Sequence, residues 1–259
     1  HKILLKGNNE LLSLSRPEAI RTIHEQYLEA GADIVETNTF SATSIAQAEH
    51  ACSHLAREMN LASVRLAKEA CAKYTAMDPS KPRFVAGAIG PMNKTASLSP
   101  DVNDPGFRAV TFDQLVTAYK EQAEALLDAG ADILLVETIF DTLNAKAALV
   151  AIREVFEQGG REVPVMISAA VGRGGETMIS AQTIGAFWSA VEHVRPLSVG
   201  LNCSLGPDLM FPFLSELAER ADVAISCYPN AGLPNPLSVT GFDLEPPDMA
   251  RCLGDFARA

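Results

Sequence analysis

The chain has 259 residues, of which 47% are hydrophobic and 20% are charged, a composition typical of globular proteins that excludes bulk disorder. Its formal net charge of −11 makes nucleic acid and anionic membrane surfaces poor partners, because an acidic surface repels both. No apolar run approaches the roughly 20 residues of a membrane span, and the first residues lack the apolar core of a signal peptide, so we expect a soluble, cytoplasmic protein.

Helical and strand patterns alternate along the whole chain, as they do in proteins built from repeated βα units around a parallel sheet. The chain has no Ser- or Gly-rich linker, so we expect one domain over residues 1–259. At this length the pattern favours a single α/β barrel. Short apolar runs predict six strands, at about residues 33–36, 84–89, 133–137, 163–168, 197–201 and 223–226.

Several residues predict where helices begin. Ser15 with Glu18, and Thr111 with Gln114, match the capping box, in which both side chains bind free backbone N–H groups of the first helical turn. Proline inside a helix costs about 3 kcal/mol or more. The helix before the sixth strand should therefore begin near Pro212 or be kinked there.

Two segments nearly repeat each other. Residues 27–40 and 126–140 share a helix end, a turn, a strand and a terminal Glu-Thr pair. In each segment a glycine, Gly31 or Gly130, follows the helix, and we expect it to adopt the left-handed conformation that ends the helix. One supersecondary unit is therefore used twice.

The loops differ in length and composition. Those at 90–104 and 229–241, after the second and sixth strands, are long and rich in Pro, Asn, Ser and Asp. Polar residues also follow the apolar strands, and in a barrel the carboxyl ends of the strands meet around one opening, where active sites lie. These residues are Glu36 to Thr39, Glu137 and Thr138, Ser168, Asn202 to Ser204, and Pro229 to Gly232.

The five cysteines are widely spaced and lack a CxxC pair, which argues against a disulfide framework. Cys203 is the most informative, because it lies where a strand becomes a loop. It could be a thiolate nucleophile, a soft metal ligand or an inert cysteine at the rim. None of the five histidines lies at a predicted strand end, so packing or surface roles are favoured for them.

Charged residues near the strand ends leave alternatives open. Glu36 and Glu137 each end a largely apolar strand, where an unpaired carboxylate is costly, so each needs a partner. A structural partner is favoured for Glu36 and a ligand ammonium group for Glu137. Lys94 and Lys146 are Schiff-base candidates of an aldolase-type barrel, although surface roles are favoured for both.

Longer motifs at 6–9, 31–40, 97–105, 137–147, 200–207 and 229–235 extend nearly from end to end of the chain. Together they resemble the homocysteine-binding barrel of the cobalamin-dependent methionine synthases. Two of them, Ser-Pro-Asp-Val-Asn-Asp-Pro at 99–105 and Phe-Asp-Thr-Leu-Asn-Ala-Lys at 140–146, favour this family over relatives that use betaine or S-methylmethionine.

In that family, zinc held by three cysteine thiolates binds the homocysteine sulfur, and the Gly-Leu-Asn-Cys motif places the first of them at Cys203. The resemblance implies that Glu137 binds the amino group of homocysteine and that Asn230 lies near or on zinc when substrate is absent. Asn38 and Thr138 are further substrate-binding candidates. Coordination would deprotonate the thiol for attack on methylcobalamin. Cobalamin and methyltetrahydrofolate would be bound by other modules of the parent chain.

The sequence also departs from the family. The family's first strand would precede His1, and its last strand, with the Cys-Cys motif that supplies two zinc ligands, would follow Ala259. We therefore expect an incomplete (β/α)8 TIM-type barrel with about six of the eight strands, weak zinc binding or none, and no activity in isolation. Cys227 and Cys252 do not match ligand positions, and residues 170–176 depart from the family pattern.

Three alternatives remain open. The chain could be a zinc-dependent homocysteine methyltransferase that uses betaine or S-methylmethionine. It could instead be a non-catalytic barrel fragment without zinc. An aldolase or lyase would require Lys94 or Lys146 inside the barrel opening.

Overall fold

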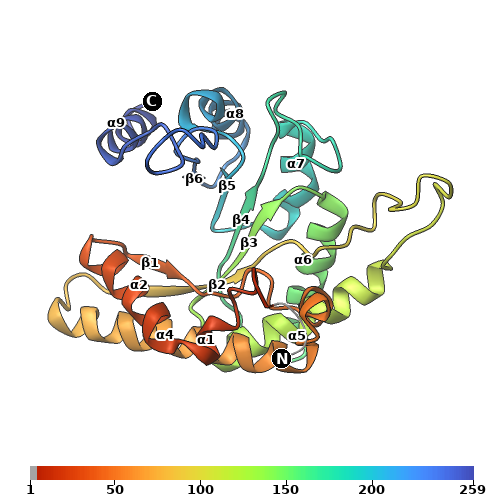
Figure 1. Cartoon of the computed structure of the whole chain (residues 1–259), viewed down its shortest axis with the longest axis horizontal. Helices are drawn as coiled ribbons and strands as arrows, with labels where there is room; N and C mark the ends of the chain where they lie inside the picture. Colours follow the sequence, from red (N-terminus) through yellow and green to blue (C-terminus); the bar gives the residue numbers. More distant parts are fainter. Residues whose placement is uncertain (1–4) are drawn as a thin grey trace. The chain divides into compact units, whose positions relative to one another are not determined.

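The computed structural model describes residues 5–259, and all six predicted strands are present in it. They form one parallel sheet in the order β1-β2-β3-β4-β5-β6 and alternate with helices (Figure 1). This arrangement confirms the predicted α/β fold and is that of an incomplete (β/α)8 barrel. The strands are β1 (Ile34–Glu36), β2 (Phe84–Ile89), β3 (Ile133–Ile139), β4 (Val165–Ala169), β5 (Ser198–Asn202) and β6 (Ala224–Tyr228).

The helices fill the intervals between strands. No helix in residues 5–259 has both the length and the hydropathy needed to cross a bilayer. The α-helices are α1 (Leu12–Ser15), α2 (Pro17–Glu29), α3 (Ser44–Gln47), α4 (Ala56–Met77), α5 (Phe112–Asp128), α6 (Thr142–Glu157), α7 (Ile184–Val191), α8 (Pro207–Arg220) and α9 (Pro246–Phe256). Three short 3-10 helices are η1 (Ala48–His50), η2 (Ser53–Leu55) and η3 (Glu192–Val194).

The chain forms two compact units, which we describe separately. Unit 1 contains the described residues up to Val136 together with Leu143–Met166, and unit 2 contains Glu137–Thr142 and Ile167–Ala259. The expectation of a single domain over residues 1–259 stays a prediction.

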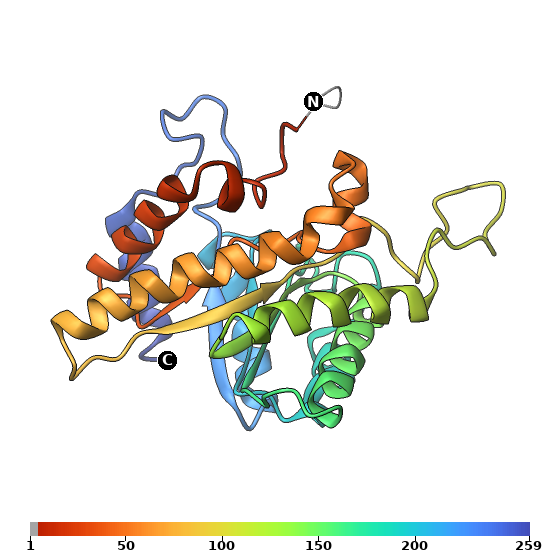
Figure 2. The same cartoon turned by 90° about the horizontal axis from the view of Figure 1, so that it is seen from below.

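In unit 1, helices α2, α4 and α5 lie side by side and cover β1 and β2 (Figure 2). Ala86, Ile133, Leu135 and Met166 pack together in its core. Strands β1 and β2 pair in parallel, with Ile34 opposite Phe84 and Glu36 opposite Ala86.

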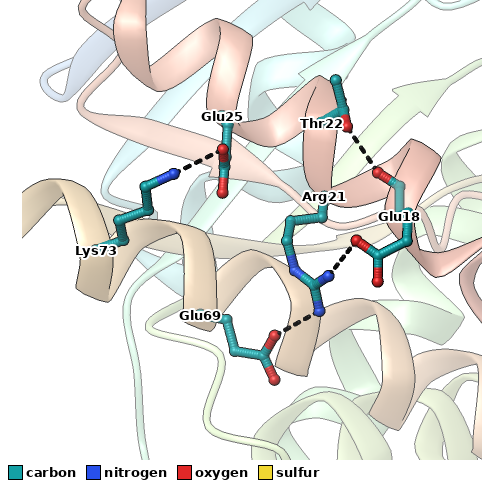
Figure 3. A network of polar contacts seen from close by, with 6 residues as sticks. All are labelled: Glu18, Arg21, Thr22, Glu25, Glu69 and Lys73. Carbon is teal, nitrogen blue, oxygen red and sulfur yellow. Dashed lines mark hydrogen bonds and ion pairs between the residues drawn. The ribbon is translucent and has the colours of Figure 1, made fainter.

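Helices α2 and α4 are also joined by ion pairs on their outer faces (Figure 3). Arg21 contacts Glu18 on its own helix and Glu69 on α4, the latter at 2.9 Å. Lys73 contacts Glu25 at 2.8 Å. These pairs are largely exposed, so packing of the apolar faces contributes more to this helix pair than the charges do.

In unit 2, β5 and β6 pair in parallel, with Gly200 opposite Ser226 and Leu201 opposite Cys227. Helix α8 packs on both strands, and α7 and α9 pack on α8. The rings of Phe211 and Phe256 stack with centroids 4.8 Å apart and fasten α9 to α8.

Most of the predicted boundary signals are confirmed. Thr111 and Gln114 form the reciprocal capping box at the start of α5. Gly31 and Gly130 have φ of +108° and +93°, so both take the left-handed conformation that the repeated segment requires. The long loops after β2 and β6 are also present, at residues 90–111 and 229–245.

Two predicted helix starts are wrong. Ser15 ends α1, where its hydroxyl donates to the carbonyl of Leu11 at 3.0 Å, and α2 begins at Pro17 without a side-chain cap. Helix α8 begins at Pro207, not near Pro212, and Pro212 lies inside it, so of the two alternatives only a kink at Pro212 stays a prediction. Pro207 is favourable at the first helical position, and the packing of α8 on β5 and β6 outweighs the hydrogen bond that Pro212 cannot donate.

The close pairing of β5 and β6 gives a testable prediction. A Cβ atom at Gly200 would collide with the carbonyl oxygen and the Oγ of Ser226. Because backbone cannot rotate away as a side chain can, we expect Gly200→Ala to destabilise the protein by about 1–3 kcal/mol. The shift of the urea midpoint measures this loss. Gly254→Ala is the matched control, since its nearest neighbour is the flexible Arg258 guanidinium at 3.6 Å; equal stability of the two variants would contradict the prediction.

Candidate functional site

Asn202 joins the ends of three strands in unit 2. It is the last residue of β5 and is only 7% exposed. Its Oδ1 accepts hydrogen bonds from Ser168 Oγ at 2.7 Å and from the backbone N–H of Thr138 at 3.1 Å. Its Nδ2 donates to Thr138 Oγ1 at 2.8 Å. One amide group therefore joins side chains at the carboxyl ends of β3, β4 and β5.

Three residues around this amide have left-handed backbone conformations. The φ angles are +56° at Thr138, +59° at Cys203 and +67° at Ser204. Such conformations cost of order 1–3 kcal/mol each in residues other than glycine, and they cluster at functional sites. For β-branched Thr138 the conformation is especially unusual. Surrounding hydrogen bonds must hold this strained rim in place.

The turn that carries Cys203 is fixed by its own set of hydrogen bonds. The backbone N–H of Cys203 donates to the carbonyl of Tyr228 at 2.8 Å, and its carbonyl accepts from the N–H of Leu205 at 2.7 Å. Ser204 Oγ donates to the carbonyl of Val171 at 2.7 Å. The Cys203 side chain is exposed, as expected for a thiol at the rim. The thiol is accessible to a reagent, a metal or a substrate.

Asn230 lies on the loop next to this turn. Its backbone N–H donates to the carbonyl of Leu205 at 2.9 Å, which links the loop after β6 to the turn after β5. The residue is half-buried, and its side-chain amide makes no hydrogen bond within the part of the chain that the structure describes. An amide in this state can accept a new partner.

Glu137 is also half-buried and directly precedes Thr138 at the end of β3. The structure thus gathers Glu137, Thr138, Ser168, Asn202 and Cys203 within unit 2. In the sequence, Glu137 directly precedes Thr138 and Cys203 directly follows Asn202, and Thr138 and Asn202 are hydrogen-bonded to each other.

The polar residues after β1 belong to unit 1. Asn38 Nδ2 donates to the carbonyl of Asn9 at 2.8 Å and to Ser13 Oγ at 3.1 Å. Both amide hydrogens are therefore used within unit 1, where they fasten the segment before α2 to the end of β1. A substrate contact through Asn38 stays a prediction, and it would have to use Oδ1.

The other candidates lie outside this group. Lys94 is exposed on the loop after β2, and Lys146 is exposed on α6. Burial raises the pKa of both Cys71 and Cys227 to about 11, which makes them poor nucleophiles. His24 is buried in α2, where desolvation lowers the pKa of its imidazole.

The donor set of residues 5–259 does not fit a complete zinc site. Zinc usually takes three or four protein ligands. Nowhere in these residues do three His, Cys, Asp or Glu side chains gather in a way that could hold a metal ion. Cys203 can supply one sulfur.

The sequence analysis missed two features of this region. Asn202 was recognised as one of several polar rim residues, but nothing in the sequence pairs it with Thr138, which lies 64 residues earlier. Residues 171–177 form a small hairpin with a bridge between Val171 and Thr177. Its Gly175 has φ of +85° and lies so close to the Phe213 ring that no larger residue would fit. The Gly-rich composition of this loop was the available signal.

A separate cavity of about 780 Å³ lies in unit 1, lined by parts of α4, α5 and the segment after α6. None of the predicted site residues lines it. Its wall mixes opposite charges, and Arg57 and Asp128 already pair with each other at 2.8 Å. It therefore presents no consistent chemistry for a ligand.

Comparisons with known proteins identify relatives of the chain. The family model described as homocysteine S-methyltransferase matches residues 2–259. Among solved structures, the homocysteine methyltransferase MmuM from Escherichia coli is similar. Its metallated form has a TM-score of 0.71 at 24% identity, with 96% of this chain and 87% of that chain covered. Its oxidized form has a TM-score of 0.72 at the same identity and coverage. These structural likenesses show the fold.

The exposure of Cys203 gives a second testable prediction. Under native conditions at pH 8, we expect iodoacetamide to modify Cys203 first, because Cys71 and Cys227 are protonated in all but roughly one molecule in a thousand at a pKa of about 11. Mass spectrometry of tryptic peptides identifies the modified residue. Cys203→Ser should abolish the fast reaction, whereas Cys252→Ser, at a buried position, should not. Fast modification of another cysteine would contradict the assignment.

Proposed function

The chain belongs to the homocysteine S-methyltransferase family, and on this basis we propose that residues 1–259 form a homocysteine-binding barrel domain that presents the substrate sulfur for methyl transfer to give methionine. One observation carries the proposal: the side-chain amide of Asn202, which directly precedes Cys203, hydrogen-bonds to Thr138, which directly follows Glu137. A carboxylate and an exposed thiol thereby stand next to residues that hydrogen-bond to each other at the carboxyl ends of β3 and β5.

We assign the amino group of homocysteine to Glu137. Homocysteine carries one ammonium group, one carboxylate and one thiol, so a site for it needs an anion and a hydrogen-bond donor on the same rim. The half-buried carboxylate of Glu137 suits the ammonium group, because partial desolvation strengthens a charge-assisted hydrogen bond. Thr138 is the proposed hydrogen-bonding residue for the rest of the substrate. Holding the substrate in one orientation contributes to rate by positioning the sulfur.

We further propose that Cys203 is a zinc ligand and that Asn230 approaches the metal when substrate is absent. The exposed thiol and the unbound side-chain amide on the adjoining loop support this assignment. Tight zinc binding would need ligands that residues 5–259 do not supply.

For the methyl donor we propose methylcobalamin, presented by a cobalamin-binding module of the same parent chain. The motifs at 99–105 and 140–146 support this donor over betaine and S-methylmethionine. The first of them lies in a loop with its own hydrogen bonds, since Ser99 Oγ donates to the carbonyl of Asp104 at 2.6 Å and Arg108 Nε donates to the carbonyl of Ala96 at 2.9 Å. Methyltetrahydrofolate would serve another module.

Substitution of Glu137 tests the assignment of the amino group. Glu137→Gln keeps the shape and removes the charge, so we expect homocysteine to bind about 10- to 150-fold more weakly, as for the loss of one charge-assisted hydrogen bond of about 1.5–3 kcal/mol. Isothermal titration calorimetry measures the change.

The controls are a ligand and a variant. 4-Mercaptobutanoate lacks the amino group and should bind Glu137→Gln and the unmodified chain equally. Glu36→Gln, at the strand end of the other repeat, should leave homocysteine binding unchanged. If Glu137→Gln bound homocysteine as tightly as the unmodified chain, Glu137 would not be the ammonium site.

Zinc binding gives a separate prediction. Because the described residues offer one rim thiol and no group of three ligands, we expect much less than one zinc per chain after dialysis against a chelator, measured by atomic emission. Residual zinc should fall further in Cys203→Ser but not in Cys252→Ser. One tightly held zinc per chain would show that the ligand assignment is wrong.

A further inference from the structure

The hydrogen bonds around Asn202 determine which way its amide points. The backbone N–H of Thr138 can only donate, and the atom it meets at 3.1 Å must therefore be the oxygen of the Asn202 amide. Ser168 Oγ, which is fully buried, donates to the same oxygen at 2.7 Å. The amide nitrogen must then face Thr138 Oγ1, 2.8 Å away.

This orientation has a consequence for the Thr138 hydroxyl. Its oxygen accepts a hydrogen bond from Asn202 Nδ2, so its own hydrogen must point elsewhere. No residue in the described part of the chain accepts that hydrogen. Thr138 is also half-exposed at the rim, next to Glu137. The hydroxyl is left as an unused donor at the position where the substrate is proposed to bind.

The first copy of the repeated segment, residues 27–40, has no such unused hydroxyl donor at its strand end. Thr37 occupies the position that matches Thr138, and its Oγ1 accepts from the N–H of Ala88 at 3.0 Å. Thr39 donates its only hydroxyl hydrogen to the carbonyl of Ala88, so the 2.6 Å contact between Thr37 and Thr39 uses the hydrogen of Thr37. Thr37 is 4% exposed and has no donor to spare.

We propose that Asn202 is a positioning residue that turns the Thr138 hydroxyl outward as the donor for the carboxylate of homocysteine. This inference rests on the proposed function, because it names the part of the substrate that the Thr138 hydroxyl meets. Asn202 does not touch the substrate. It acts by occupying the acceptor side of the hydroxyl and by holding Thr138 at φ +56°.

The Asn202→Asp variant separates the effect on the Thr138 hydroxyl from the effect on the Thr138 backbone. One carboxylate oxygen can still accept from the Thr138 N–H and from Ser168, so the backbone at Thr138 should keep its conformation. The second oxygen cannot donate to Thr138 Oγ1, and it accepts the hydroxyl hydrogen instead. The hydroxyl is thereby turned inward. Thr138→Val removes the hydroxyl and leaves Asn202 intact, and Thr138→Ser retains the hydroxyl as the matched control.

The readout compares homocysteine with 3-aminopropane-1-thiol, which has the same amine and thiol but no carboxylate. We expect Asn202→Asp and Thr138→Val each to weaken homocysteine about tenfold in calorimetric titrations and to leave the affinity for the analogue unchanged. Thr138→Ser should bind both as the unmodified chain does. In the Thr138→Val background, Asn202→Asp should cause no further loss, because there is no hydroxyl left to turn.

Each alternative outcome overturns the inference. Equal losses for homocysteine and the analogue would mean that Asn202 only supports the local structure. A loss from Asn202→Asp that persists in the Thr138→Val background would mean that the new charge repels the substrate. If the unmodified chain bound neither ligand, the proposed function would fail as well. Hydrogen exchange of the Thr138 amide reports on folding separately: it should stay protected in Asn202→Asp and exchange faster in Asn202→Ala.

Discussion

The side-chain amide of Asn202 is the interaction on which the arrangement of the candidate site depends. It bridges β3, β4 and β5 at their carboxyl ends and holds a β-branched residue in a backbone conformation that such residues rarely adopt. A buried amide whose oxygen accepts two hydrogen bonds and whose nitrogen donates one specifies one geometry, because a flip of the amide would break all three in a low-dielectric environment. The barrel supplies the strand ends, and this amide sets how the side chains on them face each other.

Local chemistry explains why most of the fold could be predicted from the sequence. The six apolar runs and the two helix-ending glycines act within a few residues of themselves, and the capping box of Thr111 and Gln114 does the same. The same locality explains the two errors. Ser15 matched a cap motif, but its hydroxyl closes the preceding short helix, and the packing of α8 overrides the local penalty of Pro212.

The candidate site could be predicted only in part. Its residue types were recognisable because polar side chains at the carboxyl ends of parallel strands meet at one opening, and Cys203 is exposed as expected. The partner of each residue could not be predicted, since it depends on strands far apart in the chain. Asn38 illustrates this limit: it lies just beyond the carboxyl end of β1, yet its amide hydrogens bind Asn9 and Ser13, so its main contacts are within its own unit. Membership of the family accounts for the presence of the motifs, and the hydrogen bonds show which of their side chains are already used within the chain.

The two copies of the Glu-Thr segment have diverged in what their threonines do. Thr37 is buried, and its hydroxyl accepts a hydrogen bond from Ala88 of β2 and donates one to Thr39. Thr138 Oγ1 also accepts from an amide nitrogen, that of Asn202, but the hydrogen of its hydroxyl meets no acceptor among the described residues, and Phe140 rather than a threonine lies two residues further on. Two copies of one βα unit can therefore differ in purpose, one committed to architecture and the other with a hydrogen-bond donor to spare, and the difference lies in a single threonine two residues further along the chain.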